Sequence, residues 1–440
     1  MFNKVKGTRD LGPQEAKLVE MIRREFLDKV RAFNFAWIDT PIMEYAQLYR
    51  RSVEGSDIVK KEMYEFKDKG NRDIALRPEG TAGFVRALVE EKWYAESKVG
   101  KFAYFGPMFR YEQPQKGRYR QFNQAGVEFL GEANPYNDAE IIILAKQILD
   151  SLNVGFILKI NSLGDLESRL NYQAKLKEYF LPFKDQLTPL SQERLENNVL
   201  RILDDKEDSQ KDFVKQAPKI NHYLNEKSKV YFEQLLQILK ANNVKYQIDY
   251  SLVRGLDYYD QVVFEFVSNS SEAGSQSTII GGGRYSKLIG ELGGPDISAC
   301  GWGFGVDRCT DLIMSEINKN SMMQEALAEK LDVYLAATTE SNLNNLFSLA
   351  NELRKYEIQC EINKELVNKS KKIFDKATKL NAKFVIFDDP INNSNILTVK
   401  NMQNGDKIKF AFTEDGYADL LEFLANDLVQ LQNLEIEDEE

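Results

Sequence analysis

Arginine residues gather in one short stretch, Phe109–Glu128, whose sequence is FRYEQPQKGRYRQFNQAGVE. Between Arg110 and Gln121 this stretch carries four basic residues and one acidic residue, although the whole chain has a net charge of −10. Arginine suits phosphate because its planar guanidinium makes paired hydrogen bonds and stays charged. The stretch therefore predicts a site for a phosphate-bearing polyanion.

The same stretch has the pattern of a β-hairpin. Aromatic and basic residues alternate on either side of a centre at Pro114–Gly117, which is typical of a turn between two strands. Since alternate side chains of a strand share a face, Arg118, Arg120 and Phe122 are expected to point the same way, with Phe122 offering a flat surface to a base. Taken alone, the stretch favours an exposed basic hairpin that binds nothing, by roughly two to one.

Composition excludes several other chemistries. The chain has one histidine, His222, which rules out Ser-His-Asp hydrolysis, Cys-His proteolysis and multi-histidine metal sites. Its three cysteines have no C-x-x-C spacing, and no P-loop sequence is present. No metal ligands are therefore predicted from the residues. Any reaction must depend on carboxylates, arginines, backbone groups or bound ions.

The size and hydropathy of the chain bound its class. With 440 residues, of which 43% are apolar and 11% aromatic, it is long enough for two or three packed domains. No run of eighteen apolar residues is present and the N-terminus is polar. We therefore expect neither a membrane span nor a signal peptide, and a cytoplasmic location.

The sequence before the arginine stretch predicts elements that could position it. Apolar residues at helical spacing predict a long helix that ends near Phe33, and residues 72–81 predict a strand that leads through a Pro-Glu-Gly turn into a helix. Glu79 and Thr81 would lie at the start of that helix. They could cap it, or Glu79 could hold a ligand ammonium group.

Three later segments are also denser in polar or glycine residues than ordinary strands. The segment Leu252–Val267 begins with a polar run, Arg254–Tyr259, before it alternates as a strand. The sequence TIIGGGRY permits close backbone approach to a ligand or a packed neighbour. The sequence GWGFGVDR, Gly301–Arg308, predicts a strand pressed against something flat, followed by a helix.

The domain organisation follows from shifts in pattern. Residues 1–328 form one predicted domain, with a charged, strand-poor helical insertion at about 165–245. Strand and helix then alternate over residues 329–430, which predicts a compact α/β domain. The acidic tail 431–440 is expected to be disordered.

Six segments, in this order along the chain, resemble histidyl-tRNA synthetases, a family of class II aminoacyl-tRNA synthetases. They are KGTRD, LRPEGT, the arginine stretch, LVRGLDYY, GGGRY and the closing G-x-G-x-D-R. The resemblance implies an α+β catalytic domain with an antiparallel sheet and a helical insertion, followed by an α/β anticodon-binding domain. It also implies a homodimer that activates L-histidine with ATP and Mg²⁺ and transfers it to the 3′ end of tRNA(His).

The resemblance assigns roles residue by residue. Arg110 resembles the arginine on the α-phosphate of ATP, Arg118 the one near the γ-phosphate, Phe122 the ring under adenine and Arg308 the arginine on the far side of the nucleotide. Arg254 resembles the family's catalytic arginine, and Arg110 would act with it. The implied histidine-binding residues are Glu79, Gly80, Thr81, Arg110, Gln124, Glu128, Arg254, Tyr258 and Tyr259.

At the hairpin tip, Gln113 and Gln115 are implied contacts of the tRNA acceptor end. Two residues depart from the family pattern, since Gln113 replaces an arginine and Asn123 replaces a histidine. A glutamine can still bond a base edge but brings no charge, so reading of the extra 5′ guanosine of tRNA(His) would differ.

The alternative interpretation is a non-catalytic, histidine-sensing paralogue, like the regulatory subunit of ATP phosphoribosyltransferase. Such paralogues typically lack the C-terminal α/β domain and lose the arginines that bind ATP. This chain keeps Arg110, Arg118, Arg254 and Arg308 and continues for about 110 residues after Lys330. The pattern therefore favours the enzyme.

Overall fold

The computed structural model describes most of the chain. The described residues are 2–52, 58–97, 100–113, 117–205, 207–253, 258–271, 277–328, 330–367, 369–388, 396–428 and 431. Arg254, Gln115 and the tail from residue 432 onward, on which predictions were made, lie outside these residues. Among the described residues, no helix has the length and apolar character needed to cross a membrane.

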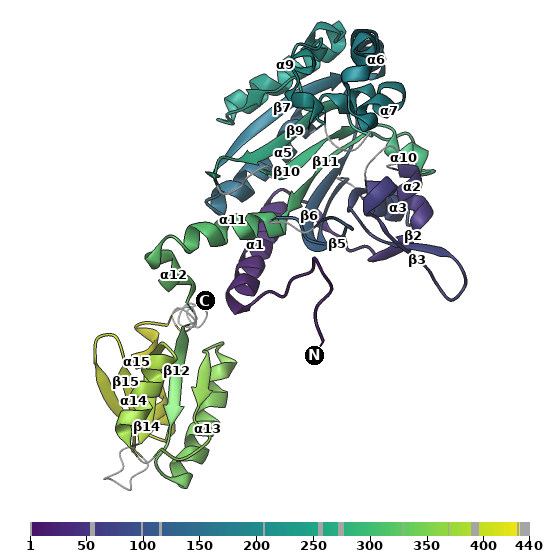
Figure 1. Ribbon diagram of the computed structural model, residues 1–440. Coiled ribbons are helices and arrows are strands. Elements are labelled where there is room, and N and C mark those ends of the chain that lie inside the picture. Colours follow the sequence, from purple (N-terminus) through teal and green to yellow (C-terminus); the bar gives the residue numbers. More distant parts are fainter. Residues whose placement is uncertain are drawn as a thin grey trace. The chain divides into compact units, whose positions relative to one another are not determined.

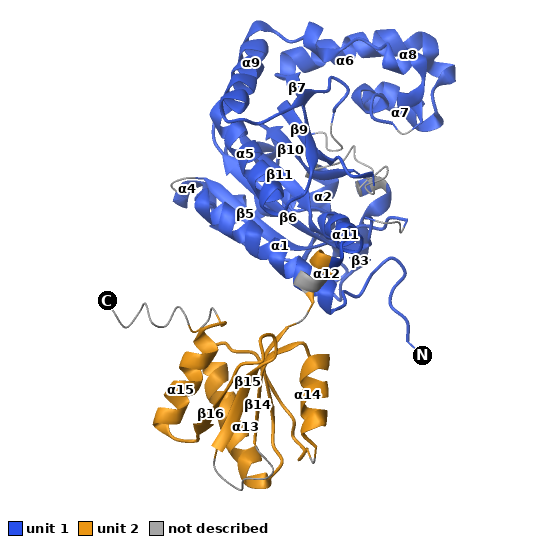
Figure 2. Ribbon diagram, turned by 90° about the vertical axis from the view of Figure 1, so that its left-hand side faces the viewer, with its two compact units in different colours: residues 1–321 blue, residues 322–440 orange. Residues whose placement is uncertain are grey.

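The chain divides into two compact units, Met1–Ser321 and Met322–Glu440 (Figure 2). The sequence placed this division later, after residue 328. The difference arises because the polar run that we took for the end of the first domain forms a helix, α12 (Ser321–Leu327), most of which groups with the second unit.

A large sheet organises the first unit (Figure 1). Its strand order is β1-β5-β6-β11-β10-β9-β7-β8. The strands from β5 to β7 in this order are antiparallel to their neighbours, whereas β1 and β8 are short, parallel edge strands. The expected antiparallel sheet is thus confirmed. The strand bounds are β1 Ala36–Trp37, β5 Lys101–Phe109, β6 Gln121–Leu130, β7 Phe156–Gly164, β8 Gln247–Ile248, β9 Asp260–Ser268, β10 Thr278–Tyr285 and β11 Ala299–Gly305.

The alternation of aromatic and glycine residues in β11 explains how the sheet is covered. Trp302 and Phe304 point to one face, where helices α1 (Pro13–Ala32) and α5 (Pro135–Ser151) pack, and the Trp302 indole donates to the carbonyl of Ile141 at 2.8 Å. Phe26 of α1 meets the Trp302 ring edge-on at 6.2 Å. The glycines between these aromatic residues face the other way and leave that side of the sheet open.

A buried ion pair joins the sheet to α5. Arg284 of β10 is 0% exposed and Asp138 is 1% exposed, and two nitrogens of the guanidinium donate to Oδ1 of Asp138 at 3.0 and 2.7 Å. The Arg284 guanidinium also donates to Oγ of Ser298 at 2.9 Å. Each charge is therefore satisfied away from water, which a buried pair requires.

A second, three-stranded sheet has the order β2-β4-β3 and precedes the arginine stretch in sequence. Its last strand leads into α3 through the turn that carries Glu79. The element bounds in this region are β2 Met43–Tyr45, α2 Ala46–Ser52, a π-helical turn Ile58–Glu62, β3 Tyr64–Lys67, β4 Asp73–Leu76, α3 Thr81–Glu90 and α4 Trp93–Glu96.

The helical insertion, predicted at about residues 165–245, lies between β7 and β8. Three of its helices begin at side-chain caps, since Asp165, Thr188 and Asn225 each accept a hydrogen bond from a backbone N–H of the first turn. Tyr172, Leu176 and Phe180 belong to a hydrophobic core that also includes Leu163 of β7 and Val263 of β9. The helices are α6 Leu166–Phe180, α7 Pro189–Asn197, α8 Asp212–Lys215 and α9 Glu226–Ala241, with 3₁₀ turns at Leu181–Gln186, Val199–Ile202, Asp208–Gln210 and Ile220–His222. Two further helices, α10 (Leu288–Glu291) and α11 (Val306–Ile317), flank β11 in sequence.

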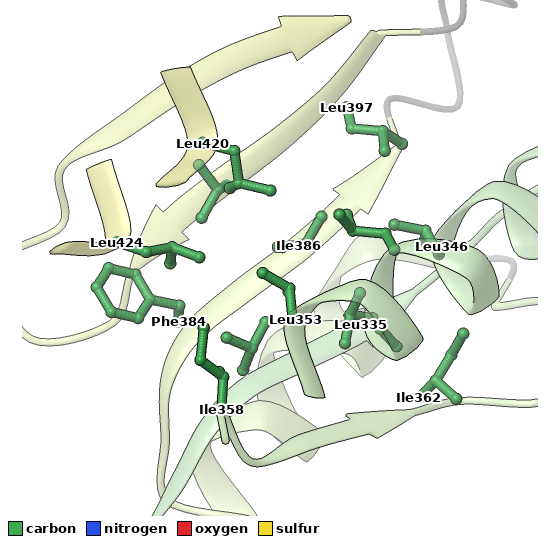
Figure 3. Close-up of a cluster of buried hydrophobic side chains, with 14 of the residues drawn as sticks. Leu335, Leu346, Leu353, Ile358, Ile362, Phe384, Ile386, Leu397, Leu420 and Leu424 are labelled. Carbon is green, nitrogen blue, oxygen red and sulfur yellow. The ribbon is translucent and has the colours of Figure 1, made fainter. Parts of the chain in front are cut away.

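The second unit is an α/β domain around a five-stranded sheet with the order β13-β12-β14-β15-β16. β12 is parallel to β13 and β14, and β15 and β16 form an antiparallel hairpin beside them. Leu335, Leu353, Phe384 and Leu420 belong to its core (Figure 3). The elements are β12 Leu331–Ala336, α13 Glu340–Lys355, β13 Cys360–Ile362, α14 Ser370–Lys379, β14 Ala382–Asp388, β15 Ile396–Asn401, β16 Lys407–Ala411 and α15 Glu414–Ala425.

Candidate active site

A cavity of about 380 Å³ lies on the open face of the large sheet. It is bordered by β6, β9, β10 and β11, by the start of α3 and by the loop that follows β5. Most of the residues that the resemblance singled out converge here from distant parts of the chain. Those that line the cavity are Glu79, Thr81, Arg110, Arg118, Phe122, Gln124, Tyr258, Tyr259 and Arg308.

Glycines make the sheet flat enough to serve as the floor of this cavity. A Cβ at Gly303 would lie 2.7 Å from Nε2 of Gln124, and one at Gly301 would lie 2.1 Å from Oε2 of Glu128. Both distances are too short for real contacts. The side chains of β6 can therefore lie across β11 only because β11 has glycine at these positions.

Glu128 forms the deepest polar group beside the cavity. It is 1% exposed, and its carboxylate accepts hydrogen bonds from the hydroxyls of Thr81 at 2.8 Å, Tyr104 at 3.3 Å and Tyr285 at 2.7 Å. Burial raises the pKa of Glu128 to about 8, although these hydroxyls act in the opposite direction. A cationic or proton-donating ligand would satisfy this carboxylate.

Glu79 has the capping role that its position suggested. Its carboxylate accepts from the backbone N–H groups of Thr81 and Ala82, both at 2.7 Å, at the start of α3. The Thr81 hydroxyl, in contrast, donates to Glu128 instead of capping the helix. Burial raises the pKa of Glu79, and the two backbone bonds oppose that shift. Gly80 lies between Glu79 and Thr81, and a Cβ at this position would lie 2.3 Å from the Tyr104 ring.

Three guanidinium groups line one end of the cavity, close enough for Arg110 and Arg118 to act electrostatically on Arg308. Arg110 donates to the carbonyl of Pro78 at 2.8 Å and lies 5.3 Å from the centre of the Phe122 ring. Arg118 pairs with Glu112 at 3.0 Å, and Arg308 donates to the carbonyl of Thr278. Nε of Arg308 is buried and has no hydrogen-bond partner within the described residues.

The electrostatics of this end favour an anion. Burial lowers the pKa of Arg308, and the nearby charges of Arg118 and Arg110 lower it further. A positive charge that is buried beside two others is stabilised by any polyanion that enters between them.

One prediction about the hairpin is wrong. Arg120 does not share a face with Arg118 and Phe122, because its guanidinium stacks on the Tyr111 ring at 3.9 Å and does not line the cavity. The reason is that the ladder between β5 and β6 ends at the pair Phe109 and Gln121, so the alternation of a strand does not extend to residues 118–120. Gln113 is exposed and lies outside the lining of the cavity.

Tyr258 and Tyr259, the last two residues of the polar run, line the cavity. The ring centres of Tyr258 and Tyr259 are 4.7 Å apart, and Tyr258 meets Tyr285 at 5.6 Å. Their neighbour Arg254, the predicted catalytic arginine, belongs to the part of the chain that is not described.

Several lining residues were not predicted. They include Glu112, Tyr119, Glu265, Thr278 and Asp307. Glu265 had a signal in the sequence, because it is the charged residue within the otherwise apolar strand VVFEFV. The alternation predicts a strand but assigns no role to its charged residue. Tyr285, which bonds Glu128, lies in the GGGRY segment, whose tyrosine received no role.

The comparison with protein families agrees with this geometry. The family described as "Histidyl-tRNA synthetase" matches residues 7–309. The chain belongs to the histidyl-tRNA synthetase family. A histidine–tRNA ligase of Mycoplasmopsis pulmonis is 45% identical over 410 residues, which cover 92% of this chain and 94% of that protein.

Solved structures from the family extend the match to three dimensions. The apo histidyl-tRNA synthetase of S. aureus superposes with a TM-score of 0.78 at 33% identity and covers 95% of this chain and 99% of its own. A Bacillus halodurans protein described as an ATP phosphoribosyltransferase regulatory subunit/histidyl-tRNA synthetase shares the fold, with a TM-score of 0.62 at 20% identity over 88% of this chain and 98% of its own.

Proposed function

We propose that this chain activates L-histidine with ATP to give histidyl-adenylate and pyrophosphate, and then transfers the histidyl group to the 3′-terminal ribose of tRNA(His). The observation that carries the proposal is the convergence of Arg110, Arg118 and Arg308 on the same cavity that Glu79 and Gln124 line, beside the buried Glu128. One end suits a triphosphate and the other suits a small molecule with ammonium and imidazole groups.

The arginine end would hold ATP. Phe122 would lie against adenine, Arg110 would contact the α-phosphate, and Arg118 and Arg308 would contact the outer phosphates from opposite sides. Joining a carboxylate to the α-phosphate brings two anions together, and the transition state places more charge on phosphorus. Fixed cations are therefore the main requirement. Arg110, with Arg254, would meet it without proton transfer.

The Glu128 end would select histidine. Glu79 and Gln124 would hold the α-amino group, and Glu128 and Tyr259 would each bond a ring nitrogen. An amino acid without such a ring would leave these buried groups unpaired, which costs about 1–3 kcal/mol for each group. Selection of this kind would need no separate editing step.

Mg²⁺ is the expected companion of ATP, and the cavity fits it. Among the described residues, no cluster of three or more His, Cys, Asp or Glu side chains could form a metal site by itself. Mg²⁺ commonly binds through one or two carboxylates together with substrate phosphates. Glu265, which lines the cavity and accepts from the Thr278 hydroxyl at 2.9 Å, is the carboxylate that we propose. The ion would neutralise phosphate charge.

The tRNA partner would contact both units. We assign anticodon binding to the second unit, where Lys371, Lys372 and Lys376 are exposed on α14. Gln113, exposed near the hairpin tip, and Gln115 are the proposed contacts of the acceptor end. We place the protein in the cytoplasm, where its tRNA substrate is used.

We also propose that two copies of the chain form a homodimer, with their interface on an exposed face of the three-stranded sheet. Met43, Tyr45 and Phe66 are 61%, 55% and 44% exposed and lie on one face of that sheet according to its register. The apolar face of α1, in contrast, is buried within the same chain. Light scattering of the purified protein should give twice the chain mass, and Tyr45→Lys should shift it toward the monomer.

The proposal is tested by charging of tRNA. Purified protein should attach labelled histidine to a tRNA(His) transcript, and a matched transcript without the extra 5′ guanosine will show how far Gln113 reads that base. Arg254→Ala should lower adenylate formation by about 10²–10³-fold with little change in fold, as for loss of one transition-state donor. Near-normal adenylation by that variant would remove its assigned role.

A further inference from the structure

The N-terminal segment reaches the nucleotide end of the proposed site although it lies outside the cavity. Backbone N–H of Arg120 donates to the carbonyl of Gly7 at 2.8 Å, so residues next to Arg9 run beside the loop that carries Arg118. The Arg9 side chain then passes between this loop and α11. It has only 14% of its surface exposed.

Arg9 contacts both the loop that carries Arg118 and the helix α11 that carries Arg308. Its guanidinium donates to Oδ1 of Asp307 at 3.2 and 2.7 Å and to Oδ1 of Asp311 at 2.7 Å, both on α11. It also lies over the Tyr119 ring at 4.2 Å and donates to that hydroxyl at 3.2 Å. Asp307 and Tyr119 are the immediate neighbours of Arg308 and Arg118 in sequence.

The other contacts close the same network. The Tyr119 hydroxyl donates to Oδ2 of Asp311 at 3.0 Å, and backbone N–H of Asn123 donates to Oδ2 of Asp307. α11 thereby binds the start of β6 as well as the N-terminal segment, and Figure 1 shows α11 beside α1. Burial alone would lower the pKa of Arg9, but Asp307 and Asp311 raise it, so it stays charged.

The contacts of Arg9 with α11 and with the loop that carries Tyr119, which we call the clamp, counteract a repulsion between arginines of the cavity lining. Arg118 and Arg308 repel each other when no phosphate lies between them, and each sits on a separate piece of chain. This repulsion, which Glu112 partly offsets, favours separation of the loop from the helix, and contacts outside the cavity oppose that separation. Arg9 pairs with carboxylates on the helix and stacks on the loop, so it joins them without adding charge to the cavity wall.

We propose that Arg9 is a positioning residue for ATP: it holds Arg118 and Arg308 at the separation that the triphosphate requires before ATP binds. This inference rests on the proposed function, and it adds how the protein positions the arginines that would bind ATP. Histidine binds at the other end of the cavity, so loss of the clamp should change recognition of ATP and leave recognition of histidine intact.

The test compares Arg9→Met with Lys4→Met in the full-length protein, using histidine-dependent ATP–pyrophosphate exchange. Lys4 is the matched control, because it lies in the same segment and its ion pair, with the exposed Asp10 at 3.5 Å, is on the surface. We expect Arg9→Met to raise the KM for ATP about tenfold or more, with the KM for histidine within about twofold of wild type. Arg9→Lys, which can pair with one carboxylate at a time, should recover part of the loss.

A second variant keeps the test decisive if Arg9→Met fails to fold. Asp311→Asn removes one partner of Arg9 outside the cavity, and it should raise the KM for ATP by a smaller factor. Combined with Arg9→Met it should add less than it does alone, since the Arg9–Asp311 contact is already lost and only the Tyr119–Asp311 bond is changed further. The clamp is refuted if both single variants keep the wild-type KM for ATP, or if the KM values for ATP and histidine rise together.

Wild-type protein is assayed in parallel, so that a failure of the proposed function can be distinguished from a failure of the clamp. Wild-type protein without exchange activity would refute the proposed function. Active wild-type protein with unaltered Arg9 variants would refute only the clamp.

Discussion

The hydroxyl of Tyr285 on β10 donates to Oε2 of Glu128 on β6 at 2.7 Å, across the intervening strand β11. Gly301 of β11 is paired with Glu128, whereas Tyr285 is paired with Ala299, and the Glu128 carboxylate lies over Gly301, where a Cβ would be 2.1 Å from Oε2. The missing side chain at Gly301 makes this bond possible, and the bond holds a buried carboxylate beside the cavity.

The pKa of Glu128 predicts how stability varies with pH. Burial raises this pKa from 4.5 to about 8, so the folded state binds the proton more tightly than the unfolded state. The stability that Glu128 contributes is therefore present in full below about pH 4.5 and is lost as pH rises through 8. Glu128→Gln should reduce the fall in the free energy of unfolding between pH 5 and 8.

Urea unfolding followed by tryptophan fluorescence measures this effect. All three tryptophans, Trp37, Trp93 and Trp302, lie in the first unit, so the signal reports on the unit that contains Glu128. A pH dependence that is the same in Glu128→Gln and wild type would contradict the raised pKa.

The glycine floor predicts contrasting effects of two identical substitutions. Gly301→Ala would place Cβ 2.1 Å from Oε2 of Glu128 and 2.4 Å from the carbonyl of Val127, so β11 or β6 must move. We expect adenylation to fall by at least about tenfold, because displacement of a site by about 1 Å has large kinetic effects. Gly290→Ala in α10 has no atom within 4 Å of its new Cβ and should keep wild-type activity. Equal activities of the two variants would count against the floor.

The Arg284–Asp138 pair predicts a large loss of stability. Asp138→Asn leaves the Arg284 guanidinium buried without its counter-charge, which typically costs about 3–5 kcal/mol. Removing the exposed pair Lys175–Glu178 by Glu178→Gln should change stability much less, because water already solvates both groups. The free energy of unfolding from tryptophan fluorescence compares the two variants, and similar losses would show that burial of the Arg284 pair is unimportant.

Residues that carry a local pattern could be predicted from the sequence. Arg118, Phe122 and Arg308 stand in short segments whose composition is unusual for scaffold, and all three line the cavity. The strand–helix alternation of the second unit was likewise readable, because its strands and helices each have a clear hydrophobic period.

Residues that act through distant partners could not be predicted. Arg9 meets Asp307 and Asp311 about 300 positions away, and no local pattern encodes such a contact. Arg120 was misplaced because the end of a strand ladder depends on the loop and the N-terminal segment packed beside it, not on the alternation of the sequence. Glu265 was overlooked because one charged residue in a strand is consistent with either a solvent-facing position or a site.

The most direct test of the central claim, that opposed arginines hold ATP beside a histidine pocket, is ATP–pyrophosphate exchange measured with and without L-histidine. The account predicts exchange with wild-type protein that depends on histidine and is not supported by other amino acids. It also predicts a loss of about 10²-fold or more in Arg308→Ala, while Arg24→Ala, exposed on α1, stays active. Histidine binding without exchange would contradict the account and favour a histidine-sensing regulator.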